Sequence, residues 1–460
     1  MPESSYECVV IGSGPGGYVA AVRASQLGMK TAIVERDAIG GRCLNYACIP
    51  AKAVLRSADV LSEIREAAAF GVVVGAPTVD FDAVVARRRR VVKTLTGGVA
   101  GLMKKNGVDV IDGHGAITDD GNVRIGGSFD GSEIAAGAVI LATGSVKRPI
   151  PGTRFGGRVI GTEEAWGLTA LPARMAVVGA GASGAEIASA YARLGTEVLL
   201  FEALDRVLPA EDAEISKLVE RGLAKQGIRI RTGTPVTDVE ALAESVRFGH
   251  AGETAEVDYL VIAAGRGPDV DGLGLAEAQI ALDASGRVAV DGAMRTSLAG
   301  VFAIGDLVAG PALAHKASEE GIIAVEAAAG RETEPIAYAD VPRATFCTPN
   351  VASFGLTEAE ARERGHDVVV GRVQYGAVGA GTVYGDRAGL VKIVGEGKYG
   401  ELLGGHIVGV KATELIQELV NVRALEGGFA EVARIVHGHP TLSEAVMEAA
   451  RDADGWLIHG

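Results

Sequence analysis

Short apolar runs rich in β-branched residues recur along the chain, and several of them end in glycine. The first lie at residues 7–11, 30–34 and 138–141, and an alanine-rich stretch at 18–27 has the spacing of a helix. Short apolar runs bounded by turns are typical of strands that are buried on both faces. Such strands separated by helices predict an α/β fold with parallel sheets.

The first apolar run leads into a glycine loop formed by Gly12, Gly14 and Gly17, and the strand after the next helix ends at Glu35. Glycines at this spacing let backbone N–H groups approach a pyrophosphate, and the helix N-terminus adds positive potential. An acid at the end of the second strand can accept hydrogen bonds from ribose hydroxyls. The segment therefore predicts a dinucleotide-binding site.

The same pattern returns at residues 175–202, which indicates a second dinucleotide site. Its loop contains Gly179, Gly181 and Gly184. Its second strand ends at Glu202, where a carboxylate binds a free 2′-hydroxyl and repels a 2′-phosphate. The second site is therefore expected to favour NAD over NADP. A further apolar run at 258–264, followed by Gly265, closes this part of the chain.

The pattern changes after residue 337. Strand-like runs at 345–347, 368–373, 390–394 and 406–410 alternate with helical stretches at 357–364 and 412–424. This part of the sequence contains no glycine loop of the kind seen earlier. It predicts a separate α+β domain.

Charge and length narrow the range of functions. The chain has 58 acidic and 44 basic residues, for a net charge of −14, which argues against a nucleic-acid or anionic-membrane partner. No apolar run reaches the roughly 18 residues that a membrane span needs. Residues 1–7 are acidic and lead directly into a strand, so no targeting peptide is expected. These features predict a cytoplasmic protein.

Two of the four cysteines, Cys43 and Cys48, are separated by four residues and precede a helix predicted at 51–69. A loop of this length lets two thiols approach to bonding distance. Cys48 lies where a helix dipole stabilises a thiolate, and Arg42 and Lys52 add positive charge nearby. The spacing is not that of a structural zinc site, so no metal is expected. Four cysteines in 460 residues are also too few for a structural disulfide framework.

Further short motifs follow in a fixed order. They are residues 41–52, Ala142-Thr143-Gly144, Glu186 after the second loop, Gly305-Asp306, Leu313 to Ala317, and His439-Pro440-Thr441 with Glu444. Together with the two loops, they make the sequence resemble the FAD-dependent pyridine nucleotide-disulfide oxidoreductase family. Within the family, the dihydrolipoamide dehydrogenases are the most similar branch. The resemblance covers essentially the whole chain.

The resemblance implies two Rossmann-like dinucleotide-binding domains, for FAD and NAD, and a C-terminal α+β dimerisation domain. The expected divisions are an FAD-binding domain with a redox disulfide at 1–149 and an NAD-binding domain at 150–267. A central segment at 268–336 would complete the FAD site, and an interface domain would follow at 337–460. The family also implies a homodimer in which each active site combines residues of both subunits.

The resemblance assigns roles to individual residues. Cys43 and Cys48 would form the redox disulfide, with His439 as the base oriented by Glu444. Catalysis would also involve Lys52 near the flavin, paired with Glu186. FAD would be bound by Gly12, Gly14, Gly17, Glu35, Arg42, Lys52, Gly115, Thr143, Gly144, Asp306, Leu313, Ala314 and His315. NAD would be bound by Gly179, Gly181, Gly184, Glu186, Glu202 and Gly265. His437 is interpreted as an ordinary surface residue.

The implied reaction is the oxidation of dihydrolipoamide, or of dihydrolipoyl groups on another chain, with NAD as acceptor. One alternative is an NAD(P)H-dependent reductase of another small disulfide, of the glutathione or mycothione type. The other is a flavoprotein that serves mainly as a binding subunit of a multienzyme complex. The residues around the cysteines that differ from those usual in the family are Arg42, Tyr46, Ala47 and Ala51. The identity of the disulfide substrate therefore stays open at this point.

Overall fold

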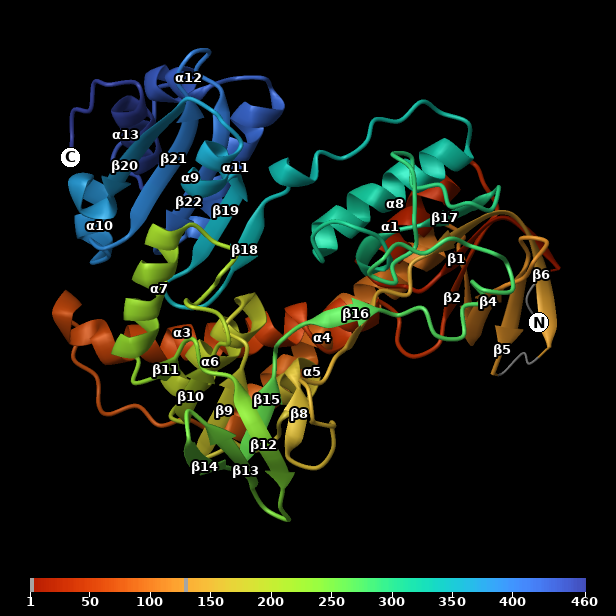
Figure 1. The fold of residues 1–460 in the computed structure, drawn as a ribbon, viewed down its shortest axis with the longest axis horizontal. Coiled ribbons are helices and arrows are strands. Elements are labelled where there is room, and N and C mark those ends of the chain that lie inside the picture. The colour runs from red at the N-terminus through yellow and green to blue at the C-terminus, as the bar shows by residue number, and fades with distance from the viewer. Residues whose placement is uncertain (1–3, 128–130) are drawn as a thin grey trace. The chain divides into compact units, whose positions relative to one another are not determined.

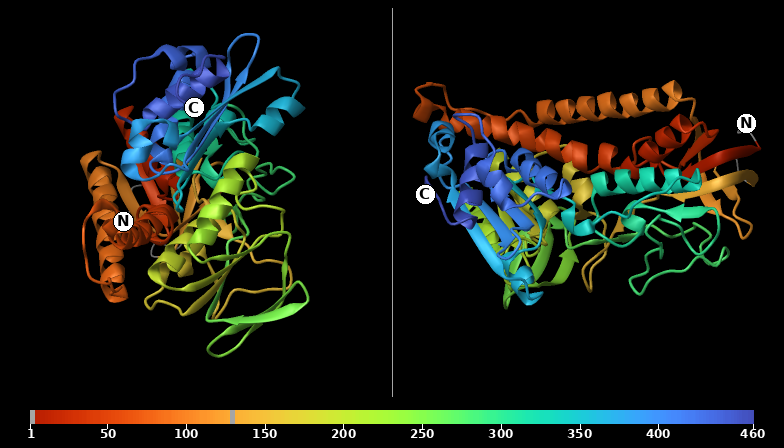
Figure 2. Two further views of the ribbon diagram at one scale, coloured as in Figure 1. Left: turned by 90° about the vertical axis from the view of Figure 1, so that its left-hand side faces the viewer. Right: turned by 90° about the horizontal axis from the view of Figure 1, so that it is seen from above.

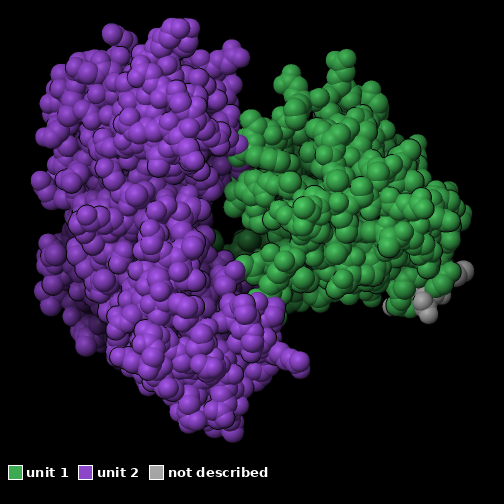
Figure 3. Space-filling view, viewed as in Figure 1, with its two compact units in different colours: residues 1–53, 83–148, 265–338 green, residues 54–82, 149–264, 339–460 purple. Residues whose placement is uncertain are grey.

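The computed structural model describes residues 4–127 and 131–460, and the chain forms two compact units. Unit 1 contains residues 1–53, 83–148 and 265–338, and unit 2 contains residues 54–82, 149–264 and 339–460 (Figure 3). Each unit therefore brings together segments that are far apart in the sequence. Among the described residues, no helix combines the length and the apolar character that a membrane span requires.

Unit 1 is organised around a seven-stranded sheet with the order β3-β2-β1-β6-β5-β4, in which β17 also pairs with β6. Its parallel strands are β1 (Ser5–Ile11), β2 (Thr31–Glu35), β3 (Asp109–Asp112), β6 (Ser132–Leu141) and β17 (Val301–Ala303). The antiparallel strands β4 (His114–Ile117) and β5 (Val123–Gly126) complete it. The apolar residues of β1, β2 and β6 are buried on both faces, as their unbroken apolar sequence predicts.

Helices α1 (Pro15–Gln26) and α8 (Ala314–Ala328) lie side by side in unit 1 (Figure 1). Their backbones meet at two glycines. A Cβ atom on Gly16 would lie 2.8 Å from the Ala317 carbonyl oxygen, and one on Gly321 would lie 2.7 Å from the Gly16 carbonyl oxygen. Only glycine allows this approach, so the contact fixes α8 against the helix that follows the first glycine loop.

The remaining elements of unit 1 are mostly short. They are α2 (Gly41–Asn45), the start of α3 (Cys48–Glu66), β7 (Ser145–Lys147), β16 (Arg266–Pro268) and η2 (Gly305–Leu307). Helix α4 (Phe81–Lys105), which begins in unit 2 and continues in unit 1, is by contrast one uninterrupted rod (Figure 2). Strands β7 and β16 pair in antiparallel fashion and bring the turns at residues 142–145 and 263–267 together.

The first half of unit 2 repeats the strand–loop–helix arrangement of unit 1. Its parallel sheet has the order β11-β10-β9-β15-β8. The strands are β8 (Val159–Gly161), β9 (Arg174–Val178), β10 (Glu197–Phe201), β11 (Arg229–Arg231) and β15 (Tyr259–Ile262). A separate antiparallel sheet contains β12 (Val236–Ala241), β13 (Val246–His250) and β14 (Glu253–Val257). The helices are α5 (Thr162–Gly167), α6 (Ala182–Leu194) and α7 (Ala213–Lys225).

The C-terminal part of unit 2 is an antiparallel sheet with helices packed on it, in the order β18-β19-β22-β21-β20. The strands are β18 (Arg343–Thr345), β19 (Val351–Gly355), β20 (Val368–Gln374), β21 (Leu390–Glu396) and β22 (Leu402–Val408). The helices are α9 (Glu358–Glu363), α10 (Gly379–Tyr384), α11 (Ala412–Ala424), α12 (Phe429–Arg434) and α13 (Ser443–Ala453). Helix α13 packs on β20 and β21.

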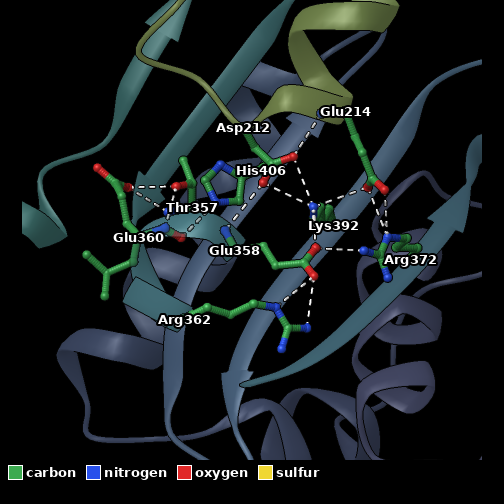
Figure 4. A network of polar contacts seen from close by, with 10 residues as sticks. Asp212, Glu214, Thr357, Glu358, Glu360, Arg362, Arg372, Lys392 and His406 are labelled. Carbon is green, nitrogen blue, oxygen red and sulfur yellow. Dashed lines mark hydrogen bonds and ion pairs between the residues drawn. The ribbon is translucent and has the colours of Figure 1, made fainter. Parts of the chain in front are cut away.

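A buried ion cluster joins α7 to this C-terminal sheet (Figure 4). The Lys392 Nζ lies 3.0 Å from both carboxylate oxygens of Asp212 and 2.9 Å from Glu358 Oε2, and its side chain is 2 % exposed. Burial acts to lower the pKa of Lys392, but its carboxylate partners together raise that pKa above its ordinary value. Asp212 also caps α7 by accepting a 3.0 Å hydrogen bond from the Glu214 N–H. The cluster therefore fixes the helix that follows the second glycine-loop segment.

Candidate active site

The two glycine loops have matching backbone geometry. Gly12 and Gly179, the first glycine of each loop, have φ angles of +102° and +100°. A Cβ atom on Gly17 would lie 1.9 Å from the Gly12 carbonyl oxygen, and one on Gly184 would lie 1.8 Å from the Gly179 carbonyl oxygen. Each helix therefore packs directly on the preceding strand end, which only glycine permits.

The middle glycine of each loop, Gly14 or Gly181, faces open space. A Cβ atom on either would meet no described atom within 4 Å. Gly14 and Gly181 are also the N-caps of α1 and α6, and neither helix start receives a hydrogen bond from a capping side chain. An anion can therefore approach the backbone N–H groups of the first helical turn at both loops. Both loops fit the pyrophosphate of a dinucleotide.

At the end of the second strand of each dinucleotide-binding segment, a glutamate forms hydrogen bonds with the backbone of the glycine loop. Glu35 accepts hydrogen bonds of 2.9 Å from the backbone N–H groups of Ser13 and Asp37. Glu202 makes the two corresponding hydrogen bonds in the second loop, at 2.7 and 3.0 Å. Glu35 Oε2 also accepts a 2.5 Å hydrogen bond from Ser13 Oγ. Glu35 Oε1 and the Glu202 carboxylate keep lone pairs that can accept a hydrogen bond from a ribose hydroxyl.

A disulfide joins Cys43 to Cys48, with their Cα atoms 4.8 Å apart. Cys43 lies in the short helix α2, and Cys48 is the first residue of α3. A Cβ atom on Gly41 would lie only 2.7 Å from the Gly14 Cα, and the Gly40 N–H donates a 3.0 Å hydrogen bond to Ser13 Oγ. The disulfide segment is therefore packed directly against the first dinucleotide loop.

Tyr46 lies between the two cysteines, and its side chain is 40 % exposed. Burial and then a hydrogen bond with Asp37 raise the pKa of Tyr46 to about 12. The phenol therefore keeps its proton across the physiological pH range. Tyr46 is therefore a neutral residue between the two cysteines in the sequence, at a position where the sequence differs from the pattern usual for the family.

A second set of polar groups lies at the ends of β6 and β17 in unit 1. Asp306 Oδ2 accepts a 2.5 Å hydrogen bond from Ser145 Oγ, which in turn accepts a 2.8 Å hydrogen bond from Arg266 Nε. Thr143 Oγ1 donates a 2.7 Å hydrogen bond to the Asp269 carbonyl oxygen. Gly144 has a φ of +80°, which lets the chain turn at this point. These contacts hold the Asp306 carboxylate at the carboxyl ends of parallel strands, where α/β folds bind ligands.

A buried clamp fixes the turn that carries Asp306. Lys316 and Glu320 form a 3.0 Å ion pair on α8, and both side chains are at most 1 % exposed. Lys316 Nζ donates a 2.9 Å hydrogen bond to the Gly305 carbonyl oxygen, and the Gly305 N–H donates a 2.7 Å hydrogen bond to Glu320 Oε2. Tyr338 completes the clamp with a 2.5 Å hydrogen bond to Glu320 Oε1. A buried ion pair persists when hydrogen bonds satisfy its remaining polar groups, as they do here.

The other residues predicted near the first dinucleotide lie on this framework. Leu313 is the N-cap of α8, and Ala314 and His315 begin its first turn. Gly115 lies on β4, and a Cβ atom there would come within 3.0 Å of the Ile11 side chain. The structure thus gives Gly115 a packing role beneath β1.

His439 and Glu444 lie together at the C-terminal end of unit 2. The His439 Nδ1 is 2.9 Å from Glu444 Oε1, and the Thr441 N–H donates a 2.9 Å hydrogen bond to Glu444 Oε2. Burial, the largest single influence, acts to raise the pKa of Glu444, but the hydrogen bonds from His439 and Thr441 hold that pKa below its ordinary value. The carboxylate therefore fixes the Nδ1–H tautomer, and the His439 side chain is 76 % exposed. Nε2 is the ring nitrogen left for proton transfer.

Two family sequence models match the chain. One, described as pyridine nucleotide-disulphide oxidoreductase, covers residues 6–321, and the other, described as the dimerisation domain of the same family, covers residues 341–450. The chain belongs to the pyridine nucleotide-disulphide oxidoreductase family.

Relatives of known name in this family cover nearly the whole chain. The dihydrolipoyl dehydrogenases of Rhizobium etli and Mycobacterium leprae are each 42 % identical, over 99 % of both chains. Among solved structures, LpdA from Mycobacterium tuberculosis has a TM-score of 0.90 at 28 % identity and covers 96 % of this chain and 99 % of its own. The Cu(II) complex of RclA, an HOCl-induced flavoprotein disulfide reductase from Escherichia coli, has a TM-score of 0.88 at 26 % identity and covers 97 % and 99 %.

This member of the pyridine nucleotide-disulphide oxidoreductases is a lipoamide dehydrogenase-type flavoprotein disulfide oxidoreductase that depends on NAD. The family uses FAD and NAD, and the two glycine loops have the open cradle that such groups need. The C-terminal match supports a homodimer. The predicted family, α/β fold class, reaction type and cofactors are confirmed.

In this oxidoreductase, Glu186 and Lys52 lie in different units, and their pairing stays a prediction. Glu186, on α6, is 5 % exposed and accepts a 2.9 Å hydrogen bond from the Phe346 N–H. It therefore joins the second dinucleotide-binding fold to the C-terminal domain.

The sequence analysis missed several polar residues of the oxidoreductase site. They are Ser145, Arg266, Asp269, Lys316 and Glu320. The only feature of the sequence that marks these residues is their position next to recognised motifs. Ser145 and Arg266 lie in the two turns that follow apolar strands, and Lys316 lies inside a motif that was already recognised.

Proposed function

We propose that this flavoprotein oxidises dihydrolipoyl groups carried on another protein chain and passes the electrons to NAD. The Cys43–Cys48 disulfide, packed against the first dinucleotide loop, is the observation that carries the proposal. Relatives named dihydrolipoyl dehydrogenase at 42 % identity support the substrate class. A cytoplasmic location is consistent with Cys8 and Cys347, which are both buried and form no disulfide.

Under this proposal, the first glycine loop, Glu35 and Asp306 would hold FAD, and the second loop and Glu202 would hold NAD. When bound, FAD would supply the electron-pair acceptor for the reduced cysteines and the hydride donor for NAD. The residues of the chain then have three tasks. They exchange the disulfide with the substrate dithiol, move the substrate's protons, and orient the base.

The exchange begins with proton transfer. His439 of the partner subunit takes a proton at Nε2 from one substrate thiol, while Glu444 of the partner subunit accepts the hydrogen bond from Nδ1–H. The substrate thiolate attacks Cys43 Sγ, the Cys43–Cys48 bond breaks, and Cys48 leaves as a thiolate. The second substrate thiol then attacks the substrate sulfur of the mixed disulfide, the bond to Cys43 Sγ breaks, and the proton of the second thiol passes to the departing Cys43 sulfur. The substrate loses two electrons and two protons. The cysteine pair gains the two electrons, one proton is on His439 of the partner subunit, and the other is on Cys43.

Steady-state kinetics of the FAD-loaded protein test this function directly. We expect NAD reduction by dihydrolipoamide, and by a dihydrolipoylated protein domain, to exceed the NADH- or NADPH-dependent reduction of glutathione disulfide and mycothione by at least about 100-fold, a discrimination that buried polar contacts can supply. A reductase of another disulfide is the competing function, and the structural similarity to RclA favours testing it. Rapid turnover of a different disulfide with negligible lipoamide activity would contradict the proposal.

Glu202 is expected to set the choice between NAD and NADP. Replacing Glu202 with alanine removes a charged acceptor from the ribose, and such a hydrogen bond contributes about 1.5–3 kcal/mol. We therefore expect kcat/KM for NAD to fall by about 10- to 100-fold while kcat/KM for NADP rises or stays constant. Glu197→Ala on the same strand is the control, since that side chain pairs with Arg174 and Arg229. An unchanged NAD-to-NADP ratio in Glu202→Ala would refute this role.

A further inference from the structure

His437 lies two residues before His439, in the segment that links α12 to α13. Its Nδ1 is 2.8 Å from the Ile435 carbonyl oxygen, and its Nε2 contacts Glu418 Oε1 on α11. The His437 side chain is only 5 % exposed, although the neighbouring Val436 is 94 % exposed. The ring therefore ties an otherwise exposed segment to the body of the C-terminal domain.

Both ring nitrogens of His437 face groups that accept hydrogen bonds. A carbonyl oxygen and a carboxylate oxygen have no proton to donate, whereas a neutral imidazole has only one N–H. Both contacts are satisfied together when the ring is the doubly protonated imidazolium. The hydrogen bond with Glu418 is also the main reason that the pKa of His437 lies above its ordinary value, against the opposing effects of burial and of Arg451.

The positive charge of His437 acts on Glu444, the residue that orients the proposed base His439. This charge is one of the influences that hold the pKa of Glu444 below its ordinary value. Glu444 in turn bonds His439 Nδ1 and the Thr441 N–H. The ring thus contacts the Ile435 carbonyl oxygen and Glu418 on α11, and the charges of Glu444 and Arg451 on α13 act on it electrostatically.

We propose that the His437–Glu418 pair is a positioning device that holds residues 435–441 in place and so sets the orientation of His439. The pair touches no reacting atom and acts only through the segment and through Glu444. The proposal rests on the assignment of His439 as the base in the proposed function.

The device has a defined pH dependence. Because Glu418 raises the pKa of His437, its contribution is complete below the ordinary histidine pKa of about 6.5 and is lost as the pH rises through the raised pKa. Glu418→Gln removes the charge and keeps a group of the same shape. We expect the variant to lose the positioning effect at a lower pH than the wild type, because the adjacent opposite charge that raises the pKa of His437 is gone.

Stopped-flow reduction of the FAD-loaded dimer separates positioning from folding. Reduction by dihydrolipoamide needs the base, whereas reduction by NADH does not. At pH 7, just above the ordinary histidine pKa, we expect Glu418→Gln and His437→Gln to slow the dithiol reaction by about tenfold, a fraction of what a positioned base contributes, and to change the NADH reaction by less than twofold. His459→Gln is the matched control, since His459 forms another histidine–carboxylate pair, with Glu448 at 3.1 Å, in the same domain.

Equal slowing of both reactions, or an alkaline limb of the dithiol reaction that does not move in Glu418→Gln, would overturn the positioning role. His439→Gln, measured in parallel, separates this failure from that of the proposed function. A slow dithiol reaction in His439→Gln with a normal one in Glu418→Gln would overturn the positioning role alone. Normal dithiol reactions in both variants would overturn the assignment of the base, and the positioning role with it.

Discussion

Replacing Cys43 with serine is expected to lower dihydrolipoamide-dependent NAD reduction by at least about 10⁴-fold, the scale seen when a catalytic nucleophile is removed. The serine leaves no disulfide for the substrate thiolate to attack, so no mixed disulfide can form. The first dinucleotide loop should be undisturbed, since the contacts of the segment with it come from Gly40 and Gly41. Electron transfer from NADH to an artificial one-electron acceptor should therefore persist, and both rates can be measured on the same preparation.

Cys48→Ser separates the two cysteines by a spectroscopic readout. The Cys48 thiolate is expected to lie beside the oxidised flavin and to give a long-wavelength absorption band after two-electron reduction. We expect Cys48→Ser to lack the band and Cys43→Ser to show it without added reductant, because Cys48 is then a free thiolate. Cys347→Ser is the control, since Cys347 Sγ already donates a hydrogen bond to the Pro349 carbonyl oxygen, which a serine can keep. A band that persists in Cys48→Ser would reverse the assignment of the two cysteines.

Features fixed by local geometry could be predicted from the sequence. The glycine loops depend on positive φ angles and on close approaches within six residues, so their spacing alone identifies them. The Cys43–Cys48 disulfide and the His439–Glu444 pair each join residues five positions apart. In all three cases, the chemistry is already contained in one short stretch of the chain.

The missed residues depend on contacts between distant segments. Ser145 and Asp306 are 161 positions apart, and Arg266 and Ser145 are 121 apart, so their contacts follow only after β6, β16 and β17 have assembled. The prediction that His437 is an ordinary surface residue was wrong for the same reason, since its side chain is only 5 % exposed. Its partner Glu418 is 19 residues away on α11, and a lone histidine in a glycine- and proline-containing segment gives no sign of this contact.

Glycine also concealed the start of one strand. The strand expected at 406–410 extends from Leu402 to Val408 in the structure. Its start was missed because Gly404 and Gly405 interrupt the apolar pattern of the sequence. A Cβ atom on Gly404 would lie 2.2 Å from the Leu356 carbonyl oxygen, and one on Gly405 would lie 2.7 Å from the Leu419 side chain. The glycines are there because β19 and α11 approach β22 closely. The sequence signal of a strand interior is therefore weakest where the packing is tightest.

His439→Gln is expected to slow dithiol-dependent reduction by about 10²- to 10⁴-fold, the usual contribution of a positioned general base. Glutamine can keep the hydrogen bond to Glu444 Oε1, but it has no nitrogen that accepts a proton near neutral pH. The loss should diminish at high pH, where the substrate thiol ionises without help. The rate of the dithiol half-reaction, measured from pH 6 to 10, should therefore rise with pH in the variant more steeply than in the wild type.

Glu444→Gln should have a smaller effect than His439→Gln, about tenfold, since the ring loses its charged partner but keeps a hydrogen-bond acceptor. Because the pKa of Glu444 lies below its ordinary value, the support that its carboxylate gives His439 is complete above the ordinary glutamate pKa of about 4.3 and is lost only as the pH falls through the lowered pKa. His459→Gln should behave like the wild type throughout. If His439→Gln retains the wild-type rate at pH 7, proton abstraction at Nε2 is not part of the reaction.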